Sequence, residues 1–231
     1  MGQLRDSVRK TNYIESIMDE LQQLLEKNKA WAENKKATDP EFFNLLAQKQ
    51  EPKYLWIGCS DSRVPATQLI GLEAGDLFVH RNVANVVVHT DFNCLSVLQY
   101  AVDVLKMNHV IVCGHYDCGG IKAAMENLQF GLIDNWLRHV QDVFHNHEKT
   151  LTEISDKHLR LNRLCELNVV EQVLNVSRTT IVQNAWRRGQ ELAVHGWIYG
   201  VHDGLLRDLG LCVTSAEELA PEYREAVEKG I

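Results

Sequence analysis

Three side chains in two separate segments have the types and the spacing to bind one metal ion. His115 and Cys118 lie three residues apart in GHYDCGG (residues 114–120), a common spacing for two ligands of one metal. Cys59 ends the apolar segment YLWIGC (residues 54–59). Two thiolates and one imidazole favour Zn²⁺ over Mg²⁺ or Ca²⁺, and three protein ligands leave the fourth position open, as in catalytic zinc sites. The alternative is that all three are ordinary buried residues of a core.

Short apolar segments predict the strands that would position these ligands. Small or polar residues follow each of them, and they cover residues 54–59, 76–83, 109–115 and 191–200. Asp91 is a candidate N-cap for a helix between the second and third strands, with an apolar face made of Phe92, Leu95, Leu98, Val102 and Leu105. Strand, helix and strand in this order predict parallel pairing. The DGLL turn at residues 203–206 predicts an antiparallel edge strand.

The predicted topology brings the candidate ligands together. In open α/β sheets, ligands bind at the carboxyl ends of the strands. Cys59 ends the first predicted strand and His115 ends the third, 56 residues later. We therefore expect both side chains at the same edge of the sheet.

The first 50 residues predict two helices that precede the first strand. Thr38 and Glu41 offer a capping box around Pro40, and helical spacing is shown by Ile14, Ile17, Met18, Leu21, Leu24 and Leu25. No Gly/Ser-rich or Pro-rich linker and no internal repeat interrupts the sequence. We expect a single domain over residues 1–231, made of a helical arm (1–50), a zinc-binding α/β core (51–214) and a C-terminal helix (215–231).

Composition narrows the class of protein. A net charge of −7 argues against nucleic acid as a partner. No run of eighteen apolar residues predicts a membrane span, and the N-terminus lacks the apolar core of a signal peptide. Six cysteines in 231 residues are too few for a disulfide scaffold, so a cytoplasmic location is expected, with import into an organelle left open. Cys94 and Cys113 are interpreted as small core residues, and the HNH segment at 145–147 as a solvated helix face.

Three motifs together resemble the β-class carbonic anhydrases. They are CSDSR (59–63), HRNVAN (80–85) and GHYDCGG, in that order, and the resemblance runs from about Ala30 to Ala216. It implies an α/β fold with a central, mainly parallel sheet flanked by helices, and N-terminal helices that pack on a partner subunit in a homodimer or a dimer-based homotetramer. It also implies Zn²⁺ as cofactor and the reversible hydration of CO2 to bicarbonate and a proton.

The resemblance assigns Cys59, His115 and Cys118 as zinc ligands, and Asp61 and Arg63 as a catalytic pair. In that family the carboxylate accepts a hydrogen bond from zinc-bound hydroxide, and the arginine holds the carboxylate. Because positions 59, 61 and 63 of an extended segment point the same way, Asp61 could instead fill the fourth zinc position in a closed, inactive state. The alternative for Asp61 is a turn residue or helix cap.

The resemblance also places residues around the substrate. Gln50 matches a substrate-side amide, and the backbone N–H of Gly119 could bind a bicarbonate oxygen. Phe78, Val83 and Tyr100 fall where the family builds an apolar CO2 pocket. A solvated loop position for Gln50, and ordinary core positions for the apolar residues, remain as alternatives.

Trp56, Arg81 and Tyr199 resemble a further set in the bacterial-type subgroup of this family. There the set binds bicarbonate at a second, noncatalytic site and favours the closed state. Core packing is the alternative for Trp56 and Tyr199. A structural ion pair is the alternative for Arg81, since arginine is seldom buried unpaired.

Other functions use the same residues. A CS2 or COS hydrolase would share the zinc site, a noncatalytic zinc protein would share the fold, and a thiol enzyme would use Cys59 or Cys118 as nucleophile with His115 as base. Candidates for transferring the proton to solvent are identified only by residue type, and they are His80, His89 and Tyr116.

Overall fold

The chain divides into two compact units, residues 1–50 and residues 51–231. The computed structural model describes the backbone of residues 2–229 and the side chains of residues 17–229. Of the predicted apolar pattern of the first helix, Ile14 lies outside the described side chains. None of the helices in the described residues is long and apolar enough to cross a membrane.

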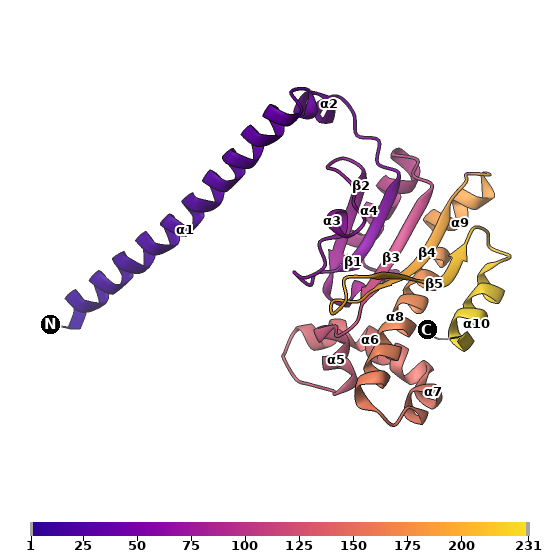
Figure 1. Ribbon diagram of the computed structural model, residues 1–231. Coiled ribbons are helices and arrows are strands. Elements are labelled where there is room, and N and C mark those ends of the chain that lie inside the picture. The colour runs from indigo at the N-terminus through magenta and orange to yellow at the C-terminus, as the bar shows by residue number, and fades with distance from the viewer. Residues whose placement is uncertain (1, 230–231) are drawn as a thin grey trace. The chain divides into compact units, whose positions relative to one another are not determined.

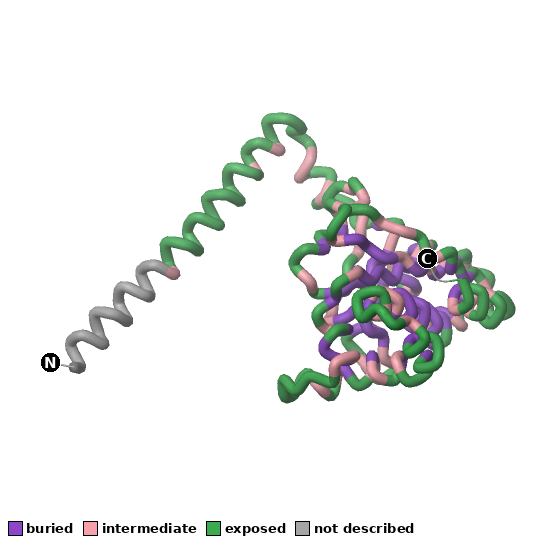
Figure 2. The backbone as a smooth tube through the Cα atoms, turned by 60° about the horizontal axis from the view of Figure 1, so that its bottom comes forward, coloured by how far each residue is buried: buried purple, intermediate pink, exposed green. Residues whose placement is uncertain are grey.

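The first unit consists of helices α1 (Gly2–Thr38) and α2 (Phe42–Gln48). Trp31 packs edge-on against Phe43 with ring centroids 5.7 Å apart, which joins the two helices. Among the described side chains of α1, exposed apolar ones include Met18, Leu21, Leu24 and Leu25, and Figure 2 colours most of this part of the backbone as exposed. A stripe of exposed apolar side chains on one helix is typical of a surface that binds another chain.

The predicted capping box at Thr38 and Glu41 is wrong. The Thr38 hydroxyl donates back to the carbonyl oxygens of Asn34 and Lys35, because α1 extends through Thr38. Glu41 is itself the N-cap residue of α2, and its side chain makes no capping hydrogen bond. The turn is held instead by the Asp39 carboxylate, which accepts from the backbone N–H of Glu41.

The second unit is built on a five-stranded sheet of order β2-β1-β3-β4-β5 (Figure 1). The first four strands in that order are parallel, and β5 runs antiparallel to β4. The strands are β1 (Tyr54–Cys59), β2 (Leu77–Asn82), β3 (His109–His115), β4 (Ala193–Tyr199) and β5 (Leu206–Val213). The predicted fold class, the four parallel strands and the antiparallel edge strand are confirmed.

Helices and turns connect the strands and cover the sheet. The helix predicted after Asp91 is present as α4 followed by the π-helical turn η2. The label η1 marks a 3₁₀ turn. The elements are α3 (Ala66–Leu69), η1 (Val83–Asn85), α4 (Phe92–Gln99), η2 (Tyr100–Val104), α5 (Gly119–Met125), α6 (Ile133–Asn146), α7 (Glu148–Glu153), α8 (Lys157–Arg178), α9 (Thr180–Arg187) and α10 (Leu219–Lys229).

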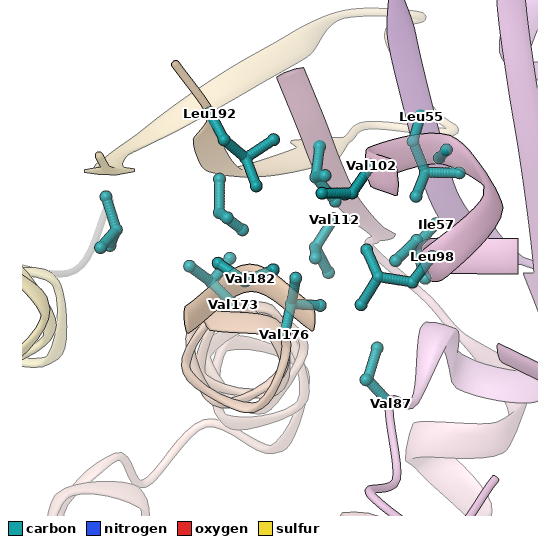
Figure 3. Packing of buried hydrophobic residues seen from close by; sticks show 14 of the residues in the cluster. Leu55, Ile57, Val87, Leu98, Val102, Val112, Val173, Val176, Val182 and Leu192 are labelled. Atoms are coloured by element: carbon teal, nitrogen blue, oxygen red, sulfur yellow. The ribbon is translucent and has the colours of Figure 1, made fainter. Parts of the chain in front are cut away.

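The main core lies between the sheet and helices α4, α8 and α9. Leu55 and Ile57 of β1 point into this core together with Val112 of β3 and Val173 of α8, as Figure 3 shows. Trp56 points to the opposite face of the sheet, into a smaller cluster. A strand buried on both faces needs a continuous apolar sequence rather than an alternating one, and YLWIGC has that form.

Two sequence predictions about helices are corrected by the structure. Asp91 caps α4 as predicted, but Phe92 is 79% exposed. At 3.6 residues per turn Phe92 lies about 120° around the helix from Leu98, which is buried. His147 is buried rather than solvated, because α6 ends at Asn146 and the chain turns inward before α7.

Candidate metal centre

The three predicted metal ligands meet at the carboxyl edge of the sheet. Cys59 ends β1, His115 ends the neighbouring strand β3, and Cys118 directly precedes α5. Their ligand atoms all lie within 4.8 Å of one another, and all three residues are buried. The two sulfur atoms are 3.9 Å apart. Asp117 has a left-handed φ of 55° in the tight turn that leads from His115 to Cys118.

The imidazole of His115 is oriented to use its second nitrogen as a ligand. Its Nδ1 lies 2.9 Å from the carbonyl oxygen of Tyr116, which can only accept, so Nδ1 carries the proton. Nε2 is buried and has no hydrogen-bond partner in the described chain. Buried polar atoms are rarely left unpaired, and metal-bound histidines commonly donate their other N–H to a carbonyl. The donor set and the unpaired nitrogen fit a zinc ion.

The sulfur of Cys59 is stabilised as a thiolate. The hydrogen bond from Cys118 lowers the pKa of Cys59 to about 4, despite burial, and hydrogen bonds from the backbone at Asp61 and Ala84 act in the same direction. The pKa of Cys118 is raised, first by that same hydrogen bond and then by burial. The sulfur pair thus holds one negative charge easily, and a bound cation would stabilise the second.

Asp61 and Arg63 form a bidentate pair beside the ligands. Arg63 donates from Nε to Asp61 Oδ1 at 2.9 Å and from Nη2 to Oδ2 at 2.7 Å, and its backbone N–H also reaches Oδ1. These hydrogen bonds hold the pKa of the Asp61 carboxyl well below its usual range. Oδ2 lies 3.7 Å from Nε2 of His115. The structure therefore has the arrangement in which the carboxylate is turned to Arg63.

Arg81 fixes the backbone between the ligand Cys59 and the acid Asp61. Its Nε donates to the carbonyl oxygen of Cys59 at 2.8 Å, and its Nη2 donates to that of Asp61 at 2.5 Å. The two acceptors are main-chain oxygens, so Arg81 is not held by an ion pair here. Arg81 thus restrains the main chain at Cys59 and Asp61, while Arg63 holds the Asp61 carboxylate.

Comparison with known proteins decides the family. The model of the carbonic anhydrase family matches residues 54–206. A carbonic anhydrase of Emericella nidulans is 49% identical over 201 residues, which cover 87% of this chain and 87% of that protein. The chain belongs to the carbonic anhydrase family. Another similar member, from Candida albicans, is 38% identical over 90% of this chain and 75% of its own length.

Similar solved structures are carbonic anhydrases of the β class. The Coccomyxa β-carbonic anhydrase in complex with acetazolamide is 40% identical, with a TM-score of 0.82 over 87% of this chain and 93% of that one. A tetrameric β-carbonic anhydrase from Sordaria macrospora is 38% identical, with a TM-score of 0.80 over 85% and 100%. The predicted family and the enzyme class are confirmed.

In this β-carbonic anhydrase fold the three residues predicted to bind a noncatalytic bicarbonate lie on one face of the sheet. Trp56 is fully buried and shares a cluster with Tyr199. Arg81 of β2 pairs with Gly58 of β1 in the parallel register, and Gly58 lies two residues after Trp56. Because side chains alternate along a strand, Arg81 and Trp56 lie on the same side of the sheet. A Cβ at Gly58 would lie 2.3 Å from Trp56 Nε1, so glycine is required there. The bicarbonate role itself stays a prediction.

The apolar residues predicted to surround the substrate lie in two separate places. Val83 lies beside the turn after Cys118, since a Cβ on Gly120 would come within 2.9 Å of its Cγ1. Phe78 and Tyr100 stack on each other, with ring centroids 5.9 Å apart. In the register, Phe78 is four residues before the end of β2, about 13 Å from the row that contains Cys59.

Two further predicted substrate residues are placed as follows. Gly119 begins α5, and a Cβ built on it meets nothing within 4 Å. Gln50 ends the first unit. All the substrate assignments stay predictions.

Polar residues of α8 support the site, and they were missing from the sequence prediction. Asn168 donates to the carbonyl oxygen of Ala84 at 2.9 Å, and Gln172 accepts from the N–H of Val87 at 2.8 Å. They hold the loop after β2 whose backbone at Ala84 is hydrogen bonded to the Cys59 sulfur. Two amides spaced by four residues in the buried, mostly apolar stretch of α8 were the available signal.

Proposed function

We propose that this protein catalyses the reversible hydration of CO2 to bicarbonate and a proton, using Zn²⁺ bound by Cys59, His115 and Cys118. The observation that carries the proposal is the buried, unpaired Nε2 of His115 beside two cysteine sulfurs. Bound zinc would supply a nucleophilic oxygen near neutral pH by lowering the pKa of water. Three protein ligands leave room for that water.

The role proposed for Asp61 is to orient a proton. Its carboxylate stays ionised because Arg63 holds both of its oxygens, and Oδ2 faces the ligand cluster. An ionised, fixed carboxylate accepts a hydrogen bond from the attacking oxygen and leaves the lone pair of that oxygen directed at CO2. The residues proposed around CO2 and bicarbonate are Gln50, Phe78, Val83, Tyr100 and Gly119.

The same geometry supports an off state. Since Arg81 fixes the backbone of Cys59 and Asp61, only the Asp61 side chain has to leave Arg63 to reach the fourth zinc position. Bicarbonate bound by Trp56, Arg81 and Tyr199 would contact the guanidinium of Arg81 beside this segment and favour the closed state. Tyr199→Phe should therefore weaken inhibition by bicarbonate. An inhibition curve equal to that of the unmodified enzyme would remove Tyr199 from the set.

We further propose a homo-oligomer, a dimer or a dimer-based tetramer, in which the arm (residues 1–50) packs on a partner subunit. The exposed apolar stripe of α1 supports this, as does the tetrameric state of the similar enzyme from Sordaria macrospora. All six cysteines are free and five are buried, which supports a cytoplasmic location.

Asp61→Asn tests the reaction. The variant should keep one zinc per chain and lose CO2 hydration by about 100-fold or more, because an amide cannot replace an ionised acceptor. Asp142→Asn, an exposed position on α6, is the matched control. Unchanged turnover in Asp61→Asn would refute the role of the carboxylate. Activity without stoichiometric zinc, or CS2 hydrolysis in place of CO2 hydration, would refute the proposed function.

A further inference from the structure

A second group of metal-ligand side chains lies outside the catalytic cluster, which is the name used for Cys59, His115 and Cys118. It contains His80, Asp91 and Cys94, whose ligand atoms all lie within 4.8 Å of one another. We propose that this group is a second metal site, which binds a divalent transition-metal ion such as Zn²⁺ with one imidazole, one carboxylate and one thiolate. The inference does not rest on the proposed CO2 chemistry, since none of the three residues belongs to the catalytic cluster.

Two elements, β2 and α4, bring the group together. His80 lies on β2 opposite Ile57 in the register, and Ile57 points toward the helices that cover this face. Asp91 is the N-cap of α4, and Cys94 is in the first turn of that helix. His80 is 8% exposed and Cys94 is 1% exposed. Asp91 is only partly buried, which leaves a path from solvent to the group.

The carboxylate of Asp91 has capacity for a metal beyond its capping role. Its Oδ1 accepts both capping hydrogen bonds, from the backbone N–H of Asn93 at 3.0 Å and of Cys94 at 3.4 Å. A carboxylate has a second oxygen with its own lone pairs, and monodentate coordination by Asp needs only one oxygen. The helix cap therefore also holds the candidate ligand in a defined orientation.

The ring of His80 has a neighbour that can orient it. Asn82 Nδ2 lies 3.4 Å from Nε2 of His80. The same amide is fixed at both ends, because Nδ2 donates to the carbonyl oxygen of Val86 and Oδ1 accepts from its N–H. Partners that orient a histidine ring are a regular feature of metal sites.

The charges of the group match a divalent cation. Burial raises the pKa of the Cys94 thiol to about 12, with a further contribution from the charge of Asp91, so without metal the thiol is neutral. Binding of M²⁺ forms a metal–sulfur bond, breaks the S–H bond and releases that proton to solvent. One thiolate and one carboxylate then cancel the two positive charges, which suits a poorly solvated position.

The second site should bind more weakly than the first. Burial opposes thiolate formation at Cys94, whereas the hydrogen bond from Cys118 stabilises the thiolate of Cys59. The cluster of Cys59, His115 and Cys118 also offers two sulfurs, and its imidazole Nε2 has no hydrogen-bond partner in the described chain, whereas Asn82 contacts His80. Filling should therefore be sequential, with the catalytic cluster first.

Co²⁺ titration of the full-length protein already holding one Zn²⁺ per chain tests the proposal. We expect a second equivalent to bind, with a thiolate-to-Co²⁺ charge-transfer absorption, while the bound zinc stays at one equivalent. Cys94→Ala and Cys94→Ser should abolish that absorption. Asp91→Asn, which keeps a good helix cap but loses the charge, should weaken binding by about 10-fold or more.

Cys212→Ser is the matched control, because Cys212 is an exposed thiol outside both clusters. It should leave the titration unchanged. The proposal is overturned if no second equivalent binds, if Co²⁺ only displaces zinc, or if both Cys94 variants bind as the unmodified protein does. Circular dichroism establishes that each variant is folded, and Asp91→Asn provides an independent test if a Cys94 variant is not. CO2 hydration is measured on the same samples, so this site and the proposed function can fail separately.

Discussion

Two buried histidines of the core, His115 and His147, differ in what faces their Nε2 atoms. Nε2 of His147 lies 2.7 Å from Oε1 of Glu171, which also accepts a hydrogen bond from the hydroxyl of Tyr223 at 2.6 Å. Nε2 of His115 has no hydrogen-bond partner in the described chain, although two cysteine sulfurs lie close to it. Protein groups therefore satisfy Nε2 of His147, whereas Nε2 of His115 keeps a lone pair that a metal ion could accept.

The contacts of His147 and of His115 serve different purposes, one structural and one suited to ligand binding. The contacts of Glu171 connect the α6–α7 junction, α8 and α10, and thus join segments far apart in the chain. The contacts around His115 give it one donated hydrogen bond and a free lone pair. A buried polar atom without a partner destabilises the fold, so an unpaired ring nitrogen indicates a ligand rather than a structural role.

The largest expected effect is on metal binding. His115→Ala should lower zinc affinity by more than about 100-fold, because removing groups that merely orient a ligand already costs 10–100-fold. His147→Ala should keep one zinc per chain. Zinc content after dialysis against a weak chelator measures both. Equal zinc retention by the two variants would show that the unpaired nitrogen does not mark the metal site.

The next largest effect is on the free energy of unfolding. Here the variant at His147 should lose more than the variant at His115. His147→Ala should lower the free energy of unfolding by about 3 kcal/mol, because it leaves the buried carboxylate of Glu171 without the hydrogen bond to His147. Urea denaturation of the metal-free protein measures this without a contribution from zinc. In that form His115→Ala should be the milder change. A loss at His147 below that at His115 would contradict the structural role given to the Glu171 contacts.

A smaller loss of unfolding free energy is expected at Tyr223, which also contacts Glu171. Tyr223→Phe removes one hydrogen bond to a carboxylate and should cost about 1.5 kcal/mol of unfolding free energy. Zinc content and CO2 hydration should not change, because Tyr223 lies on α10, outside the metal cluster. Tyr54→Phe serves as the control for loss of a tyrosine hydroxyl. A change in zinc content would show that the two regions are coupled.

The smallest effect is a change in the pH dependence of stability. Burial alone would raise the pKa of Glu171, but hydrogen bonds from His147 and Tyr223 outweigh it and hold the pKa below its ordinary value. A lowered folded pKa stabilises the protein above the unfolded value of about 4.3, and this stabilisation is lost as pH falls through the folded pKa. Glu171→Gln should show a shallower acid dependence below about pH 4.5. Parallel curves for the two proteins would contradict the pKa direction.

Much of the metal site could be predicted from sequence because its determinants are local. YLWIGC ends as a strand at Cys59, HVIVCGH ends as a strand at His115, and Cys118 follows after one tight turn. The Asp61–Arg63 pair spans two residues of the same segment and needed no distant contact. Parallel pairing then aligned the strand ends, as the order of the elements predicted.

Other features could not be predicted because they depend on packing between distant segments. Sequence pattern placed His147 on a solvated face, but its partner Glu171 is 24 residues away on another helix. Arg81 was considered for an ion pair, but it donates to backbone carbonyls that only the sheet register brings near. Cys94 was interpreted as a core residue, and its proximity to His80 follows from the docking of α4 on β2.

The sequence by itself determined the strands, the ligand types and the family, because apolar runs, turn residues and short spacings act over a few residues. Only the tertiary structure decided which buried polar atoms are paired and which are not. Pairing depends on distances between side chains that are far apart in the chain, and those distances exist only once helices have packed on the sheet. The free Nε2 of His115 is therefore a property of the fold, although the residues that create it could be recognised beforehand.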